Sequence, residues 1–185
     1  PSSIPADGNH TWDDEFPGGT DAWHTNAVYV EENGDFLLSL LAPSTVFRVR
    51  ADTGEIDWTL AGDGIGSTVP TTLTMLNPTR DGFSSQHNIQ VSPTGSLVLF
   101  DNGGNGAARG VEYDLDLVAG TARLETEWPF PSAGCFIQSS IYALPGGHKV
   151  MTCADDHVAV ELDETGQEIW RADLECPGDT FEQPL

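Results

Sequence analysis

Basic residues are scarce in this chain of 185 residues, and their scarcity excludes two classes of partner. There are 7 Lys and Arg against 29 Asp and Glu, which gives a formal net charge of −22, and Lys149 is the only lysine. Nucleic acids and anionic membrane surfaces bind proteins through cationic side chains. We therefore expect no nucleic-acid partner and no attraction to a membrane surface.

Long apolar runs are also missing. The longest, from Phe36 to Leu41, is interrupted by Ser39 and is far shorter than the roughly 20 residues that a membrane-spanning helix needs. We therefore expect no membrane insertion. The chain begins Pro1-Ser2-Ser3, without an initiator Met or a targeting segment, which predicts a mature, trimmed or partial chain.

What is present indicates a folded all-β protein. Hydrophobic residues make up 38% of the chain and aromatic residues 9%, too many for a disordered acidic segment. The 20 Gly and 12 Pro punctuate short runs rich in Val, Thr, Phe and Trp. Such runs between turn residues are typical of many short strands.

Three units of the chain repeat one order of strands and turns, at residues 21–63, 83–132 and 133–175. Trp58 lies four residues after Gly54, Trp170 lies four after Gly166, and Trp128 takes the matching place in the second unit. The expected strands are 26–30, 36–40, 45–50, 55–60, 89–91, 97–100, 111–115, 121–128, 140–144, 150–153, 158–162 and 168–171.

Repeats of this size with four antiparallel strands predict a β-propeller, each unit being one blade. A sandwich of hairpins would explain the frequent turns but not the shared Trp position. Propellers typically have 4–8 blades, so three blades predict a fragment or half of an assembly. The remaining segments are an N-terminal segment (1–20), an insertion loop (64–82) and a tail (176–185).

The innermost strand of each blade lines the channel of a propeller, so polar residues where these strands begin are candidate site residues. They lie at 23–26, 86–88 and 136–140, and they include His24 and His87. If the two histidines occupy equivalent positions, they face one another across the channel mouth, where each could act as acid, base or nucleophile. The alternative is that each histidine only caps a strand.

An ordered series of motifs between Asp21 and Arg171 resembles the arylsulfotransferase (arylsulfate sulfotransferase-like) family. The matching segments are Trp23-His24-Thr25-Asn26-Ala27-Val28, Asn33-Gly34-Asp35-Phe36-Leu37-Leu38-Ser39, Thr53-Gly54-Glu55-Ile56-Asp57-Trp58, Phe83-Ser84-Ser85-Gln86-His87-Asn88-Ile89-Gln90, Leu99-Phe100-Asp101-Asn102-Gly103 and Val111-Glu112-Tyr113-Asp114-Leu115-Asp116.

The resemblance implies a six-bladed propeller, exported in bacteria to the periplasm, cell surface or medium. It implies transfer of a sulfuryl group from a phenolic sulfate ester to a phenol through a sulfated histidine, without a nucleotide cofactor. It places His24 and His87 in the active-site channel, and it suggests that Arg109 binds the sulfate. The alternative for Arg109 is a surface pair with a carboxylate. The candidate substrate-binding residues are Asn26, Asn88 and Gln138.

The third unit departs from the family pattern. The family's nucleophilic histidine is expected there, but the segment from Cys135 to Ser139 contains none. His148 and His157 lie in connections between strands, where we expect them to be solvated. The nucleophile then lies in a missing blade, or the chain is a non-catalytic extracellular propeller that binds a ligand or a partner.

The three cysteines have no short Cys-x-x-Cys spacing, so we expect no metal site in them. Cys135 and Cys153 flank the hairpin of the third unit and are a candidate disulfide, which would fit an oxidising compartment. Two buried thiols are the alternative, and Cys176 is left over. The acidic runs 13–15 and 155–156 lack the ligand spacing of a calcium loop. We expect them to be solvated surface charge, with no metal and no cofactor.

Overall fold

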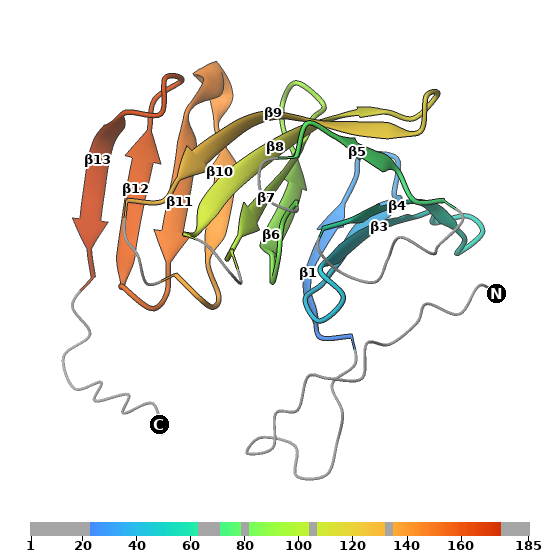
Figure 1. Cartoon of the computed structure of the whole chain (residues 1–185), viewed down its shortest axis with the longest axis horizontal. Helices are drawn as coiled ribbons and strands as arrows, with labels where there is room; N and C mark the ends of the chain where they lie inside the picture. The colour runs from blue at the N-terminus through green and yellow to red at the C-terminus, as the bar shows by residue number, and fades with distance from the viewer. Residues whose placement is uncertain (1–22, 63–70, 79–81, 104–106, 132–134, 175–185) are drawn as a thin grey trace, which may run out of the picture.

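The computed structural model describes residues 23–62, 71–78, 82–103, 107–131 and 135–174. In this part of the chain the regular structure is strands, apart from one short 3₁₀ turn at Pro145–Gly147. The strands form three sheets that follow one another along the chain and lie side by side (Figure 1). The expected all-β fold with four-stranded antiparallel blades is therefore what the structure shows.

The first blade has the strand order β1-β2-β3-β4. Its strands are β1 (Thr25–Val30), β2 (Phe36–Leu40), β3 (Thr45–Val49) and β4 (Ile56–Ala61). All its neighbouring strands are antiparallel. Their side chains alternate between the two faces of the sheet, so the blade presents one face to the next blade and one away from it.

The second blade contains five strands, one more than expected. Its strands are β6 (His87–Val91), β7 (Leu97–Asp101), β8 (Arg109–Asp116), β9 (Thr121–Pro129) and β5 (Thr74–Leu76). β5 comes from the segment that we expected to be an insertion loop, and it pairs in parallel with β9 at the outer edge. This strand was not predictable from the sequence, because its partner β9 begins 45 residues after the end of β5.

The third blade repeats the first, with the order β10-β11-β12-β13. Its strands are β10 (Ser140–Ala143), β11 (Lys149–Cys153), β12 (Val158–Leu162) and β13 (Glu168–Asp173). The first hairpin of each blade turns at a glycine with positive φ, namely Gly34 (90°), Gly95 (92°) and Gly147 (86°). Because this backbone region disfavours side chains with a Cβ, the three glycines mark equivalent positions.

Two apolar cores hold the three blades together. One lies between the first and second blades and includes Leu37, Leu60, Leu99 and Tyr113. The other lies between the second and third and includes Val98, Trp128, Ile141 and Met151. At the second interface a Cβ on Gly110 would lie 2.2 Å from Cδ1 of Ile141, so the blades approach more closely there than a larger residue allows.

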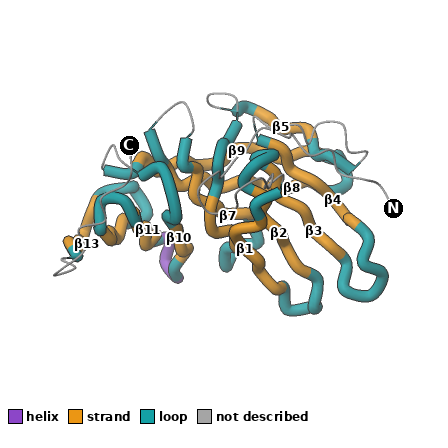
Figure 2. The backbone as a smooth tube through the Cα atoms, turned by 90° about the horizontal axis from the view of Figure 1, so that it is seen from below, coloured by secondary structure: helices purple, strands orange, loops and turns teal. Residues whose placement is uncertain are grey.

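The outer faces of the row of blades are apolar and open. Val28 is 61% exposed, whereas Ile89 and Ile141, at the same distance before their turn glycines, are 3% and 0% exposed. Trp58 is 5% exposed and Trp170 is 50% exposed. The equivalent residues are covered wherever a neighbouring blade is present. Figure 2 shows β1–β4 at one end of the row of blades and β10, β11 and β13 at the other. No helix among the described residues is long and apolar enough to cross a bilayer.

Candidate functional site

The starts of the three inner strands are tied to one another across the blades. The Asn26 side chain donates to the backbone oxygen of Gln86 at 2.7 Å. Between the next two blades, the backbone N–H of Ile141 donates to Oδ1 of Asn88 at 3.2 Å. The candidate residues that the sequence placed in different blades therefore come together at one end of the inner strands.

His87 is the first residue of β6 and is 9% exposed. Its Nδ1 lies 2.9 Å from Oδ1 of Asn102 and 3.2 Å from the backbone oxygen of Ser85. Both partners are hydrogen-bond acceptors, so the neutral ring carries its proton on Nδ1. Nε2 then presents a lone pair, and no described residue hydrogen-bonds it.

The surroundings of His87 also favour its neutral form. Burial, the largest effect, lowers the pKa of the imidazole below its ordinary value of 6.5. The hydrogen bonds to Asn102 and Ser85 act in the opposite direction, and the nearby His24 lowers the pKa further. A neutral imidazole whose Nε2 carries no proton is the form that can act as a nucleophile or a general base.

His24 and His87 are close enough to influence one another, but they are not in equivalent positions. His87 lies eight residues before its turn glycine, Gly95, whereas His24 lies ten residues before Gly34. His24 precedes β1 and has a positive φ of 43°. The two histidines are therefore out of register, because the motif before β1 places its histidine two residues further from the turn glycine.

The position of His87 is occupied by a different polar residue in each blade. Eight residues before the turn glycine stand Asn26 in the first blade and Ser139 in the third. Ser139 is 3% exposed, and its hydroxyl donates to the backbone oxygen of Ile137 at 3.1 Å. Within the three described blades, His87 alone offers an imidazole at this position.

Arg109 has contacts that differ from those expected of a sulfate ligand. Its guanidinium is buried and pairs with the Asp101 carboxylate at 2.8 Å and with Glu127, and it also donates to the backbone oxygen of Gly82 at 2.6 Å. Carboxylates therefore stand where a sulfate was expected. These contacts give Arg109 a structural role, unlike the surface pair that was the alternative, because both Arg109 and Asp101 are 1% exposed.

Asp101, which pairs with Arg109, holds the backbone at two places, one shortly before His87 and one directly after Asn102. Oδ1 of Asp101 accepts from the backbone N–H groups of Ser84, at 2.9 Å, and Gly103, at 2.8 Å. Ser84 precedes His87 by three residues, and Gly103 follows Asn102 directly. Sequence reasoning singled out the segment of Asp101 and Asn102 as a family motif but assigned these two residues no role.

The candidate substrate-binding residues divide into two groups. Asn26 and Asn88 use their side chains to join neighbouring blades, as described above. Gln138 is exposed, has a positive φ of 48°, and makes no side-chain hydrogen bond with a described residue. Gln138 thus remains available to a ligand, whereas the two asparagines have partners within the fold.

Gln86 belongs to the candidate segment 86–88, but the sequence indicated no particular role for it. It is fully buried, and its Nε2 lies 2.9 Å from both Oγ of Ser39 and the backbone oxygen of Leu40. The second blade thereby inserts a side chain into the first. The only feature of the sequence that pointed to Gln86 was its place beside His87 in the motif.

Cys135 and Cys153 form a disulfide in the structure. These cysteines and Asp156 are a described group of possible metal ligands, but joined sulfurs cannot bind a metal as thiolates. Asp155 accepts hydrogen bonds from the backbone N–H groups of Phe136 (2.6 Å) and Ile137 (3.0 Å). The acidic run 155–156 therefore organises the segment after Cys135, while Cys176 and the run 13–15 lie outside the described residues.

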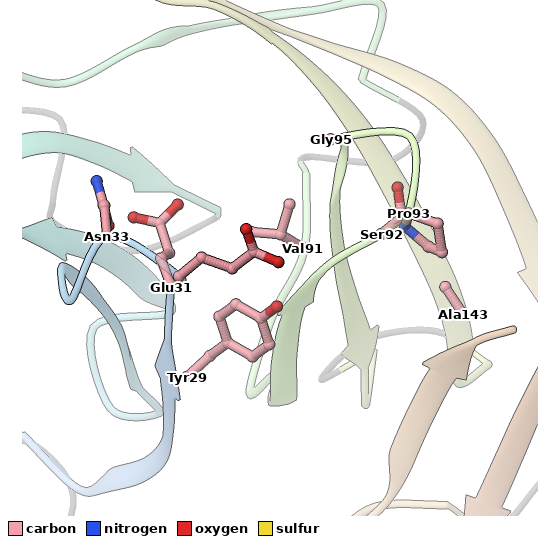
Figure 3. Close-up of a pocket in the computed structure, with 9 residues that line it drawn as sticks. Tyr29, Glu31, Asn33, Val91, Ser92, Pro93, Gly95 and Ala143 are labelled. Carbon is pink, nitrogen blue, oxygen red and sulfur yellow. The ribbon is translucent and has the colours of Figure 1, made fainter.

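A cavity of about 560 Å³ lies at the other end of the inner strands, near the turns (Figure 3). Tyr29, Glu31, Val91, Ser92 and Ala143 line it, with four further residues. Its carboxylates would repel an anionic ester, and none of the predicted site residues lines it. The histidine end of the inner strands is therefore the candidate site for such a ligand.

The cations of the described residues are all paired with carboxylates. Their nearest carboxylate partners lie within 4.0 Å in each case, for Arg48, Arg50, Arg109, Arg123, Lys149 and Arg171. The remaining cation, Arg80, lies outside the described residues. An anion that binds to the described part of the chain can therefore contact imidazole rings and backbone groups, but it meets no Lys or Arg that is free of a carboxylate partner.

The three blades and their polar inner ends define this protein as a β-propeller, and its fold is shared with solved structures. A catalytically inactive virginiamycin B lyase from Staphylococcus aureus with quinupristin is 17% identical, with a TM-score of 0.54 over 88% of this chain and 45% of that one. A streptogramin B lyase is 15% identical, with a TM-score of 0.53 over 94% of this chain and 43% of that one. A protein from Lactobacillus plantarum is 16% identical, with a TM-score of 0.55 over 84% of this chain and 44% of that one.

At these identities the likeness concerns the fold alone, and the chain spans less than half the length of each of these propellers. A search of curated proteins gave no match. Residues 6–175 match the family described as arylsulfotransferase (ASST). The chain therefore belongs to the arylsulfotransferase family.

Proposed function

We propose that this chain carries part of an active site that transfers a sulfuryl group from a phenolic sulfate ester to an acceptor phenol. Membership of the arylsulfotransferase family supports the reaction class. The observation that carries the proposal is the His87 imidazole, whose Nδ1 faces two acceptors and whose pKa is lowered by burial. At neutral pH this ring is uncharged and has its lone pair on Nε2.

In the proposed first step, Nε2 of His87 attacks the ester sulfur. The N–S bond forms as the bond between sulfur and the aryl oxygen breaks, and the phenolate leaves and takes a proton from solvent. In the second step the oxygen of the acceptor phenol attacks the same sulfur, the N–S bond breaks, and the phenol proton is released. The histidine is restored, and no nucleotide takes part.

His24 is the second histidine of the proposed site. Its charge influences that of His87, which supports a place near the reacting ester. Because every described cation already pairs with a carboxylate, we propose that His24, backbone N–H groups, and residues outside the described part of the chain or in further blades contact the sulfate oxygens. Gln138 is our candidate for a substrate contact from the third blade.

Further blades are part of the proposal. The open faces at Val28 and Trp170 are the equivalents of faces that neighbouring blades cover elsewhere in the chain. We propose that blades of the same kind cover them, from a second copy or from further sequence of the same protein. Light scattering of the purified chain separates these sources, because a second copy requires a mass near twice 19.8 kDa.

The test of the proposed reaction is turnover of an aryl sulfate by the wild type and by a His87→Ala variant. We expect the variant to lose turnover while circular dichroism and the unfolding midpoint stay close to those of the wild type. His157→Ala, in an exposed connection between strands, is the matched control and should retain turnover. Equal turnover in His87→Ala and wild type would contradict the assignment.

A second candidate is a non-catalytic propeller that binds a ligand, and the absence of an uncommitted cation among the described residues favours it. Calorimetric titration distinguishes the two. An aryl sulfate that binds and is recovered intact indicates a binding module, whereas transfer to an added phenol indicates the enzyme. The Cys135–Cys153 disulfide fits an oxidising compartment, so we propose that either protein is exported.

A further inference from the structure

Asn102 connects the candidate nucleophile to the third blade. It lies directly after β7 and is 2% exposed. Its Oδ1 lies 2.9 Å from Nδ1 of His87, and its Nδ2 donates to the backbone oxygen of Cys135 at 2.9 Å. Oγ of Ser139 lies 3.5 Å from the same Nδ2. One amide therefore reaches both the imidazole and the segment that precedes β10.

These contacts determine which way the amide faces. The Cys135 oxygen is a carbonyl and can only accept, so the amide NH₂ must face it. The opposite orientation would bring two acceptor oxygens together in a buried place, which is costly. With the NH₂ committed to Cys135, Oδ1 faces the imidazole, and it can only accept a proton from Nδ1.

The carbonyl that orients Asn102 is itself held in place. Cys135 is joined to Cys153 by the disulfide, and Asp155 binds the two backbone N–H groups that follow Cys135. On the other side of Asn102, Asp101 is fixed by Arg109 and by two backbone N–H groups. The amide therefore sits between two anchored segments.

We propose that Asn102 is a positioning residue that holds the neutral His87 ring in the form protonated on Nδ1 and aims its Nε2 lone pair into the site. The consequence for catalysis rests on the proposed function. When Nε2 bonds to sulfur, the ring becomes a cation that must keep its Nδ1 proton. The Asn102 and Ser85 oxygens then accept from a charged donor, and such hydrogen bonds are stronger than those to a neutral ring.

Two substitutions distinguish positioning from general damage because they shift the pKa of His87 in opposite directions. Asn102→Ala removes an acceptor that raises the pKa, so the pKa should fall, and with only Ser85 left the ring should populate both neutral forms. Asn102→Asp keeps an acceptor and adds a negative charge, so the pKa should rise and the Nδ1-protonated form should persist. His24 is the titratable group that also acts on this ring.

The experiment is ¹⁵N NMR of the histidine rings in the full chain without substrate, over a pH titration. We expect neutral His87 in the wild type to be protonated on Nδ1, and the pKa of His87 to move down in Asn102→Ala and up in Asn102→Asp. Asn33→Ala, an exposed asparagine in the β1–β2 turn, is the matched control and should leave His87 unchanged. With an aryl sulfate, Asn102→Ala should show a loss of turnover relative to the wild type and to Asn33→Ala.

A wild-type ring protonated on Nε2 would overturn the proposal without any variant. The proposal would also be overturned if the pKa of His87 were equal in the wild type and both variants, or if both variants shifted this pKa in the same direction. Because the NMR signals need no substrate, the two claims can fail separately. If the NMR signals are as predicted but no turnover is found, only the proposed function is contradicted. If turnover depends on His87 but its neutral ring is protonated on Nε2, only the role of Asn102 is contradicted.

Discussion

The role of Arg109 can be tested by replacing its charge with an apolar side chain of similar length. In Arg109→Met the Asp101 carboxylate, which is 1% exposed, keeps the backbone N–H groups of Ser84 and Gly103 but loses its cation. Removing one partner of a buried ion pair costs about 3–5 kcal/mol. Glu127 has a side chain that is 39% exposed, so its release to water adds little.

The two remaining N–H donors place the expected loss at the lower end, about 3 kcal/mol. This is a large fraction of the roughly 5–15 kcal/mol by which domains are stable. The measurement is urea unfolding followed by tryptophan fluorescence. Adding Asp101→Asn to Arg109→Met removes the uncompensated charge while keeping an acceptor for the two N–H groups, so it should recover part of the stability.

The matched control is Arg50→Met, because Arg50 is exposed and pairs with an exposed Asp52. We expect no measurable change in the free energy of unfolding for that variant. If Arg109→Met unfolds at the wild-type urea concentration and instead weakens binding of an aryl sulfate, the structural role is refuted. The sulfate-binding role that the resemblance implied would then be correct.

Three further predictions follow from burial and charge. Trp58→Ala should cost about 3–5 kcal/mol of unfolding free energy, whereas Trp170→Ala, at a half-exposed position, should cost much less; equal losses in urea unfolding would show that the face at Trp170 is covered. Replacing Cys135 and Cys153 by serine should lower stability by about 3 kcal/mol for a loop of this length, and an unchanged midpoint would contradict a disulfide in solution. Because the folded pKa of His87 is depressed, its contribution to stability is present above pH about 6.5 and is lost as pH falls toward the folded value. The same titration should reduce turnover, and a rise in turnover as the pH falls through this range would contradict a neutral nucleophile.

The strands were predictable because the hairpin turns of this chain are regular. The segment 36–40 was expected as a strand and is β2, and 158–162 is β12. The repeated spacing from a turn glycine to a tryptophan also placed Trp58 and Trp170 on equivalent faces. Burial was not predictable, because it depends on whether a neighbouring blade is present.

The contacts of Arg109 could have been found from the register of one hairpin. Leu97 pairs with Tyr113, and continuing the same register brings Asp101 opposite Arg109. A count of net charge over the whole chain could not show this, because it says nothing about which carboxylate each cation meets. The local pairing therefore gives Arg109 a buried carboxylate partner that the resemblance to the family did not indicate.

The Asn102 contact with His87 depended on tertiary structure in a way that the motifs did not reveal. His87 begins β6, and Asn102 lies directly after the neighbouring antiparallel strand β7, 15 positions further along the chain. The orientation of the amide is determined by a carbonyl of the next blade, 33 positions further on. Sequence reasoning identified both histidines but had no means of choosing between their ring nitrogens.

The most direct test of the central claim is to identify where the sulfuryl group goes. The full chain would be mixed with an aryl sulfate in the absence of acceptor, quenched, digested and analysed by tandem mass spectrometry. We expect one sulfuryl group on the peptide that contains His87, lost when a phenol is added before quenching and absent in His87→Ala. Transfer to the phenol with the label on another residue, or with no labelled peptide from this chain, would contradict it.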